Sequence, residues 1–189
     1  MKYIEVELKF SLSDPAALAQ RLADLGGQPQ GENRQTDVYF NAAHRDFLAE
    51  DVVSEWLRLR TEIDGDGRQS HSINFKRWLP LGAVEATHCD EFESAIGNHE
   101  AFRRLLEALG FTEMVTVDKT RRQWRLGDVV IAVDIVANLG SFAEFEYVGD
   151  AGTVQEATSE LHLTVDKIGI QLGERDRRGY PYQVLDRER

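Results

Sequence analysis

The sequence predicts an α+β protein, with one β-rich domain whose strands form an antiparallel sheet and a few helices between them. Segments that alternate apolar and polar residues recur along the chain, and this period of two is typical of half-buried strands. Three further segments carry apolar residues at helical spacing behind a capping residue. In both halves of the chain, a strand with alternating acidic residues precedes a helix that ends at glycine. This weak repeat suggests one pseudo-symmetric domain.

The first half of the chain begins with strict alternation over residues 4–10, where apolar residues alternate with Glu5, Glu7 and Lys9. Asp14-Pro15 then supplies a helix cap and a first-turn proline, and Gly26-Gly27 ends that helix. Loops are expected where the chain is polar and irregular. Further strands are expected at residues 36–40, 56–62, 72–78 and 90–94, with loops at 43–55 and 79–88 and a turn at Asp64-Gly65-Asp66-Gly67.

The second half of the chain continues the same pattern. Asn98 caps a helix that ends at Gly110, and Thr153 with Glu156 forms a capping box for a helix whose apolar stripe runs to Leu172. Nothing divides the chain, so we expect a single domain over residues 1–189. Strands are expected at residues 115–126, 129–136 and 141–148, followed by a charged tail over 175–189.

The charge of the chain excludes several classes of partner. Its 189 residues hold 22 basic and 33 acidic side chains, for a net charge of −11, which argues against nucleic acid and anionic membranes. No apolar run reaches the ~18 residues of a membrane helix, and the first residues do not resemble a signal peptide. One cysteine cannot form an internal disulfide. We therefore expect a soluble, cytoplasmic protein.

The unusual feature is the number of strands that carry charges on one face. A solvent-facing sheet explains any single stripe, but solvent faces normally mix polar residue types and these separate into acid and base. If the stripes point into a closed barrel, cations would bind phosphate oxygens and paired carboxylates would hold Mg²⁺ or Mn²⁺. The stripes are Glu5/Glu7/Lys9, Arg58/Arg60, Glu91/Glu93, Lys119/Arg121 and Glu144/Glu146, with Lys76 and Asp134 as single charges in other strands.

The ordered set of these motifs resembles the CYTH superfamily, also called triphosphate tunnel metalloenzymes. Its ExExK signature matches Glu5-Val6-Glu7-Leu8-Lys9, and the resemblance covers residues 3–186. Within the superfamily, two segments look most like the class IV adenylyl cyclase branch, Thr36-Asp37-Val38-Tyr39-Phe40 and Leu139-Gly140-Ser141-Phe142-Ala143-Glu144. The resemblance implies a closed antiparallel eight-stranded β-barrel, the triphosphate tunnel, with helices packed outside. The other matching segments are Leu57-Arg58-Leu59-Arg60, Phe75-Lys76, Glu91-Phe92-Glu93, Asp118-Lys119-Thr120-Arg121, Val133-Asp134 and Glu144-Phe145-Glu146.

The resemblance also implies roles for the charged residues. Two ions, Mg²⁺ or Mn²⁺, would be held by Glu5, Glu7, Glu144 and Glu146, and Asp134 would either assist a metal or pair with a tunnel cation. Glu91 and Glu93 are further tunnel acids. The triphosphate would be gripped by Lys9, Arg58, Arg60, Lys76, Lys119 and Arg121, among which Lys9, Lys76 and Arg121 are the expected catalytic residues.

The expected reaction is conversion of ATP to cyclic AMP and pyrophosphate. A triphosphatase acting on thiamine triphosphate, inorganic triphosphate or a nucleoside triphosphate is the alternative, and a binder without turnover is a third. The partner is a small-molecule triphosphate, and family members are often homodimers. A ribose would need a base pocket at the tunnel mouth, for which Tyr39, Phe40, Trp78 and Phe142 are candidate walls or ordinary core residues.

Overall fold

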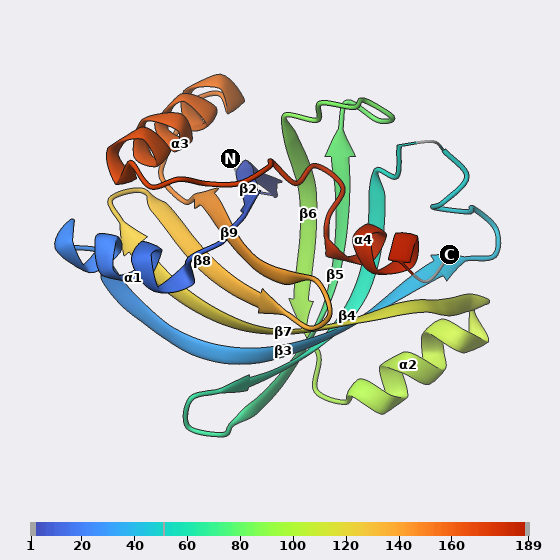
Figure 1. Cartoon of the computed structure of the whole chain (residues 1–189). Helices are drawn as coiled ribbons and strands as arrows, with labels where there is room; N and C mark the ends of the chain where they lie inside the picture. The colour runs from blue at the N-terminus through green and yellow to red at the C-terminus, as the bar shows by residue number, and fades with distance from the viewer. Residues whose placement is uncertain (1–2, 51, 188–189) are drawn as a thin grey trace.

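The computed structural model describes residues 3–50 and 52–187, and its main feature is one antiparallel sheet that curls into a nearly closed barrel (Figure 1). The strands are β1 (Ile4–Glu5), β2 (Glu7–Ser11), β3 (Gln28–Ala42), β4 (Glu55–Asp64), β5 (Gln69–Leu79), β6 (His88–Ala95), β7 (Phe111–Leu126), β8 (Val129–Val136) and β9 (Gly140–Tyr147). Around the barrel they follow the order β1-β6-β5-β4-β3-β7-β8-β9-β2.

The N-terminal strand closes the barrel in two pieces. It is interrupted at Val6, so that β1 pairs with β6, placing Glu5 opposite Cys89, whereas β2 pairs with β9, placing Lys9 opposite Glu144. The two pieces together fill one position between the edges of the sheet. The nine labelled strands therefore fill eight positions, and the expected antiparallel eight-stranded barrel is confirmed.

The longest strands, β3 and β7, extend well beyond the predicted segments. β3 covers 15 residues, Gln28–Ala42, where the sequence predicted a strand over residues 36–40. Its first half is mostly exposed, so it shows no apolar alternation. This half is a strand because it pairs with the end of β7, where Gln28 lies opposite Arg125.

Three of the four helices begin at the predicted caps. The Asp14 side chain accepts from the Ala17 amide, the Asn98 side chain accepts from the Ala101 amide, and the Thr153–Glu156 capping box is complete. The helices are α1 (Pro15–Asp24), α2 (His99–Ala108), α3 (Val154–Ile168) and α4 (Tyr180–Arg187).

Two predictions about the C-terminal part were wrong. Helix α3 ends at Ile168 rather than near Leu172, because Gly169 adopts a left-handed conformation with φ of 65°. The segment expected to be a charged tail contains α4, whose Tyr180 and Pro181 are buried. This short helix depends on tertiary packing, which the local sequence does not report.

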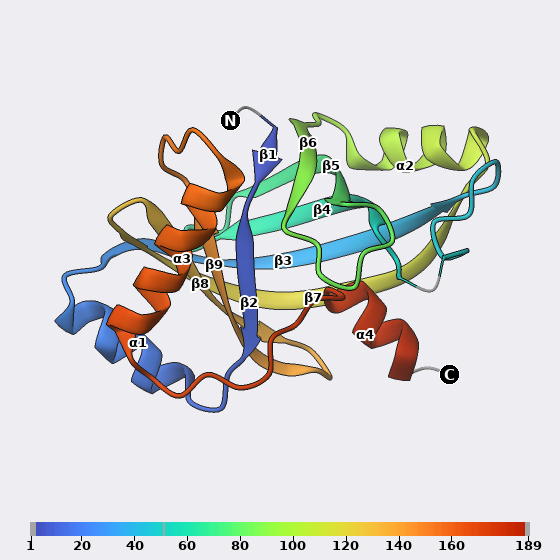
Figure 2. The ribbon, with the colours of Figure 1, turned by 90° about the horizontal axis from the view of Figure 1, so that it is seen from above.

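The helices lie outside the barrel or across one end of it (Figures 1 and 2). α1 and α3 cover the outer face of β2, β8 and β9, where Leu8, Ile131 and Phe145 are buried. α2 packs through Leu106 on the outer face of β3 and β4. α4 lies over an aromatic cluster at one end of the lumen. Within the described residues, no helix is long and apolar enough to cross a membrane.

Candidate functional site

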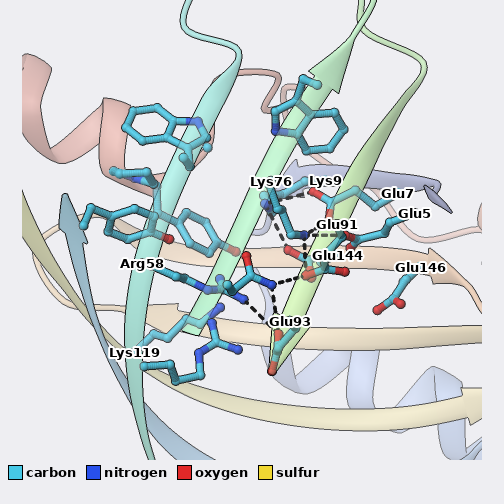
Figure 3. Close-up of a pocket in the computed structure, with 18 of the residues that line it drawn as sticks. Glu5, Glu7, Lys9, Arg58, Lys76, Glu91, Glu93, Lys119, Glu144 and Glu146 are labelled. Atoms are coloured by element: carbon cyan, nitrogen blue, oxygen red, sulfur yellow. Dashed lines mark hydrogen bonds and ion pairs between the residues drawn. The ribbon is translucent and has the colours of Figure 1, made fainter. Parts of the chain in front are cut away.

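The lumen of the barrel forms a charged cavity of about 250 Å³. Alternation along each strand sends every second side chain inward, so the apolar positions of the same strands pack outward on the helices. Twelve of the thirteen charged residues predicted for the site line this cavity. Figure 3 shows the side chains of Lys76, Glu5 and Glu91 pointing toward one another. The twelve are Glu5, Glu7, Lys9, Arg58, Arg60, Lys76, Glu91, Glu93, Lys119, Arg121, Glu144 and Glu146.

Lys76 lies at the centre of the acidic side of the cavity. Its Nζ is 2.6 Å from Glu5 Oε2, 3.4 Å from Glu7 Oε2 and 3.7 Å from Glu91 Oε1. Burial disfavours the charged amine, but these carboxylates raise the pKa of Lys76 well above its usual value. The pKa of Glu5 is raised by burial and by the charges of Glu7 and Glu91, which outweigh the effect of Lys76. The site thus holds more buried acid than one lysine neutralises.

Lys9 joins the acidic side to the rest of the cavity. Its Nζ lies 3.2 Å from Glu7 Oε1 and 3.0 Å from Glu144 Oε2, and 4.6 Å from the centre of the Tyr180 ring. Burial opposes its charge, yet Glu144 and Glu7 raise the pKa of Lys9 above its ordinary value. Lys9 is therefore a cation at neutral pH.

Asp134 anchors the cations on the opposite wall. Asp134 is 0 % exposed. Its carboxylate accepts two hydrogen bonds of 2.7 Å from the Arg121 guanidinium. It also accepts one of 3.1 Å from Lys119 Nζ and one of 2.8 Å from the Tyr180 hydroxyl. Burial would raise the pKa of Asp134, but Arg121 and Lys119 lower it to about 2. Asp134 does not line the cavity. Of the two roles left open by the sequence, the structure shows the pairing with tunnel cations.

The same network sets the charge of the basic residues around it. Burial and repulsion by Arg121 lower the pKa of Lys119 to about 7, although Asp134 opposes the shift. Arg121 has a second carboxylate partner, since its Nη2 lies 2.9 Å from Glu144 Oε1. Arg121 therefore stays charged, whereas Lys119 titrates near neutral pH.

Asp37 plays the corresponding part for the arginines of β4. It is 1 % exposed, receives two 2.7 Å hydrogen bonds from Arg60 and lies 3.5 Å from Arg58. Burial acts to raise the pKa of Asp37, but the two arginines bring it well below the ordinary range. The Arg58 Nε is buried without a hydrogen-bond partner in the described residues. Arg58 thus presents an unsatisfied donor at the cavity wall.

Three functional neighbours were missed by the sequence reasoning. Asp37 and Tyr180 are described above, and the third is Asn74, which is 1 % exposed and donates to Glu91 at 2.6 Å and to Glu93 at 2.9 Å. Asn74 stands two residues before Lys76, so the period of two that identified Lys76 also places Asn74 on the inner face. Asp37 likewise stands two residues before Tyr39, so the same period places it on the inner face of its strand.

Glu146 differs from the other carboxylates of the cavity. Its side chain forms no hydrogen bond or ion pair in the described part of the chain, and Figure 3 shows it apart from the bonded network. Burial raises its pKa to about 7, with Lys76 acting against the shift and Glu144 and Glu7 adding to it. No three acidic, histidine or cysteine side chains among the described residues form a ready metal cluster, because lysines lie between the carboxylates.

The aromatic residues expected at the tunnel mouth fall into different environments. Tyr39 and Trp78 line the charged cavity together with Trp56. Of the two roles left open for Phe40, the structure shows the ordinary core residue, because Phe40 is the neighbour of inward-facing Tyr39 and packs outward in the α2 cluster. Phe142 lines a second cavity beside the barrel end.

The fold and the cavity define a class of protein, a closed barrel whose lumen carries acidic and basic stripes side by side. The CYTH domain family model matches residues 3–180, and the chain belongs to this family. It is 32% identical over 143 residues to "Putative adenylate cyclase MJ0240" of Methanocaldococcus jannaschii, covering 76% of both chains. It is 25% identical to "Adenylate cyclase CyaB" of Aeromonas hydrophila, covering 93% of this chain and 86% of that protein.

Solved structures share the same architecture. The PH1819 protein of Pyrococcus horikoshii superposes with a TM-score of 0.82 at 26% identity, over 97% of this chain and 99% of that chain. HpAC1 of Hippeastrum, whose structure is described as revealing a dominant triphosphatase activity, superposes with a TM-score of 0.63 at 16% identity, over 98% and 95% of the two chains. The second likeness shows the fold alone.

Proposed function

We propose that this protein is a metal-dependent enzyme that acts on a triphosphate, and that it converts ATP to cyclic AMP and pyrophosphate. The observation that carries the proposal is the lumen, where six cations and six carboxylates line one cavity. The unsatisfied Nε of Arg58 supports an anionic ligand there. The adenylate cyclase names of the two relatives favour the cyclase reaction.

The carboxylates of the lumen fit divalent cations. Oxygen ligands of this kind suit Mg²⁺ and Mn²⁺, and Glu146 is a half-buried carboxylate that forms no side-chain hydrogen bond or ion pair within the described residues. Glu5, Glu7, Glu144 and Glu146 would hold the two ions. When bound, such ions polarise phosphoryl oxygens and lower the pKa of an attacking hydroxyl. Lys76 and Lys9, which now neutralise these acids, would then be available to phosphate oxygens.

The protein's own residues would position the triphosphate and neutralise its charge. Asp37 fixes the Arg60 guanidinium and Asp134 fixes that of Arg121, so both are held in place before substrate enters. In the reaction the ribose 3′-oxygen forms a bond to the α-phosphorus, and the bond from that phosphorus to the leaving pyrophosphate breaks. Preorganised cations stabilise the charge that develops on these oxygens.

A triphosphatase is the second candidate, because the activity described for HpAC1 occurs on the same fold. In that reaction the cations grip the triphosphate in the same way, but water attacks a terminal phosphorus. The two reactions differ in the nucleophile that lies in line with the scissile bond.

Product analysis tests the proposal. The purified protein is incubated with ATP and Mn²⁺ or Mg²⁺, and the products are separated by chromatography. Cyclic AMP with pyrophosphate is expected, whereas ADP with phosphate would establish the hydrolase. Lys76→Ala should abolish turnover, and the matched variant Arg77→Ala, whose side chain pairs with Asp90 away from the cavity, should retain it. Metal-independent ATP binding without turnover would refute an enzymatic role.

A further inference from the structure

One large side chain of the C-terminal segment reaches into the charged lumen. Of the described residues that line the lumen, all but Gly179, Tyr180 and Pro181 belong to barrel strands. Tyr180 is the first residue of α4 and is 4 % exposed. It takes no part in the chemistry proposed above, yet it contacts charged groups on both sides of the lumen.

Tyr180 makes three contacts with these charged groups. Its ring centre lies 4.6 Å from Lys9 Nζ and 5.1 Å from Lys119 Nζ. Its hydroxyl donates a 2.8 Å hydrogen bond to Asp134 Oδ2. An ammonium group within about 6 Å of an aromatic ring centre is attracted by the ring electrons, and more strongly where water is excluded. One ring therefore attracts two ammonium groups that belong to different strands, β2 and β7.

The two lysines depend on such a partner to different degrees. Lys9 has two carboxylate partners, whereas Asp134 is the one ion-pair partner of Lys119 among the described residues. Arg121 binds the same Asp134 carboxylate through two shorter hydrogen bonds. Burial and repulsion by Arg121 accordingly lower the pKa of Lys119 to about 7. The Tyr180 ring supplies part of the attraction that the carboxylates leave missing.

The segment before α4 directs Tyr180 to this place by running alongside β2. The Asp176 amide donates to the Lys9 carbonyl at 2.8 Å, so the segment is bound to the same strand that carries the lysine. The Asp176 side chain then accepts a hydrogen bond from the Gly179 amide. Gly179 has a φ of 81°, a left-handed conformation that glycine adopts without a steric penalty. The chain thus turns at Gly179, and Tyr180 enters the lumen beside Lys9.

We propose that Tyr180 is a positioning residue, whose ring holds the ammonium groups of Lys9 and Lys119 in place for the triphosphate. The inference rests on the proposed function and deepens it, because it makes the grip on the substrate depend on the C-terminal segment. With α4 seated over the barrel end, the triphosphate meets cations that are already fixed on both sides of the lumen. Cations fixed in advance stabilise developing charge without a reorganisation cost at the moment of reaction.

Two substitutions of Tyr180 separate the ring from the hydroxyl. Tyr180→Leu removes both and leaves an apolar side chain, whereas Tyr180→Phe keeps the ring and loses only the bond to Asp134. The matched control is Val184→Ala, because Val184 lies on α4 and packs in the same apolar cluster but does not line the lumen. All variants are compared as full-length proteins at a temperature where urea denaturation shows each of them to be folded.

We expect Tyr180→Leu to lower turnover of ATP at least ~10-fold, chiefly in kcat, because displaced cations no longer match the charge that develops in the transition state. Tyr180→Phe should recover most of this loss and stay within ~3-fold of wild type, since the attraction comes from the ring face. Val184→Ala should turn over ATP like wild type, whatever stability it loses.

The lysine ε-methylene signals in NMR spectra give a readout that does not depend on activity. The chain has five lysines, so the signals of Lys9 and Lys119 can be assigned with Lys9→Arg and Lys119→Arg. Protons that lie over an aromatic ring are shifted upfield by its ring current. Both signals should move to the ordinary lysine position in Tyr180→Leu and stay shifted in Tyr180→Phe.

Three results would overturn the inference and leave the proposed function intact. They are a wild-type kcat in Tyr180→Leu, equal losses of kcat in Tyr180→Leu and Tyr180→Phe, and lysine signals that are the same in Tyr180→Leu as in wild type. A loss in Val184→Ala as large as in Tyr180→Leu would do the same, since it would trace the effect to the packing of α4. Wild-type protein that neither binds tripolyphosphate nor turns over ATP would instead overturn the proposed function.

Discussion

Replacing Asp134 by asparagine tests whether the buried acid behind the lumen holds the cation wall together. The substitution keeps the shape and removes one charge that faces Arg121 at 2.7 Å and Lys119 at 3.1 Å. Arg121 keeps Glu144 as a partner, but Lys119 has no other ion pair among the described residues. Breaking a buried pair from one side typically costs ~3–5 kcal/mol. We expect a loss of this size in the free energy of unfolding of Asp134→Asn.

Urea denaturation at pH 7 in the presence of a chelator measures this loss. With slopes of about 1–3 kcal/mol per molar urea, the midpoint should fall by roughly 1–2 M or more. The matched control is Asp118→Asn on the outer face of β7, where Asp118 faces Arg34 at 3.8 Å and both side chains are solvent-exposed. Exposed pairs of this kind contribute ~0–1 kcal/mol, so the control midpoint should hardly move.

The chelator makes the experiment decisive between the two roles that the sequence allowed for Asp134. A pairing partner is needed whether or not metal is present, whereas a metal ligand can be lost from metal-free protein at little cost. If Asp134→Asn matches the control in chelator and loses stability only against metal-loaded wild type, the assignment to the cation wall is wrong.

Three further changes follow from the same geometry. Glu146 has a folded-state pKa of about 7, above the ordinary glutamate value of 4.5, so the folded protein holds a proton that the unfolded chain has lost between these values. Metal-free wild type should therefore lose stability as pH rises from about 4.5 to 7. Glu146→Gln should show a smaller loss in urea titrations, because only Glu5, whose pKa is also raised, keeps its contribution, and an identical pH slope in both proteins would exclude Glu146 as a source. Arg121→Ala should lower kcat ~10²–10³-fold, the usual cost of removing one electrostatic donor, while Arg122→Ala, exposed on the outer face and paired with Glu32, should turn over ATP like wild type; equal losses would place the site elsewhere. Tyr180→Phe keeps the ring beside Lys9 but removes the 2.8 Å bond to Asp134, so unfolding should cost ~1.5–3 kcal/mol less, whereas unchanged stability would show that α4 is held by apolar packing alone.

The inward-facing charges could be predicted from sequence because every second side chain of a barrel strand points into the lumen. Where two charges stand two residues apart, as in Arg58 and Arg60, the pattern is visible without knowing the partner strands. A lone inward residue such as Asn74 or Asp37 gives no such signal, since a single polar residue in a strand is equally compatible with solvent. These residues are recognised only through their partners across the lumen.

Features that depend on distant contacts were beyond the reach of local patterns. The exposed half of β3 is a strand because β7 lies beside it, and α4 makes contacts with residues far away in the chain, such as the bond from Tyr180 to Asp134, 46 positions earlier. The aromatic residues show the same limit. Tyr39 and Phe40 are neighbours of similar size, yet one lines the lumen and the other packs under α2. To assign them, one must know which face of the strand points into the lumen, and a run of apolar residues does not reveal this.

The charge balance of the lumen explains why a net charge of −11 is compatible with a polyanionic substrate. Six lining carboxylates match six lining cations in number, so the acidic excess of the sequence belongs to the rest of the protein and repels long polyanions at the surface. A triphosphate entering this balanced interior alone would leave uncompensated negative charge in a low-dielectric space, which is costly. Divalent cations bound by the carboxylates would restore neutrality and release the lysines to the phosphates. On this reasoning the carboxylates and cations serve one ligand set, and tripolyphosphate should bind far more weakly without metal than with it.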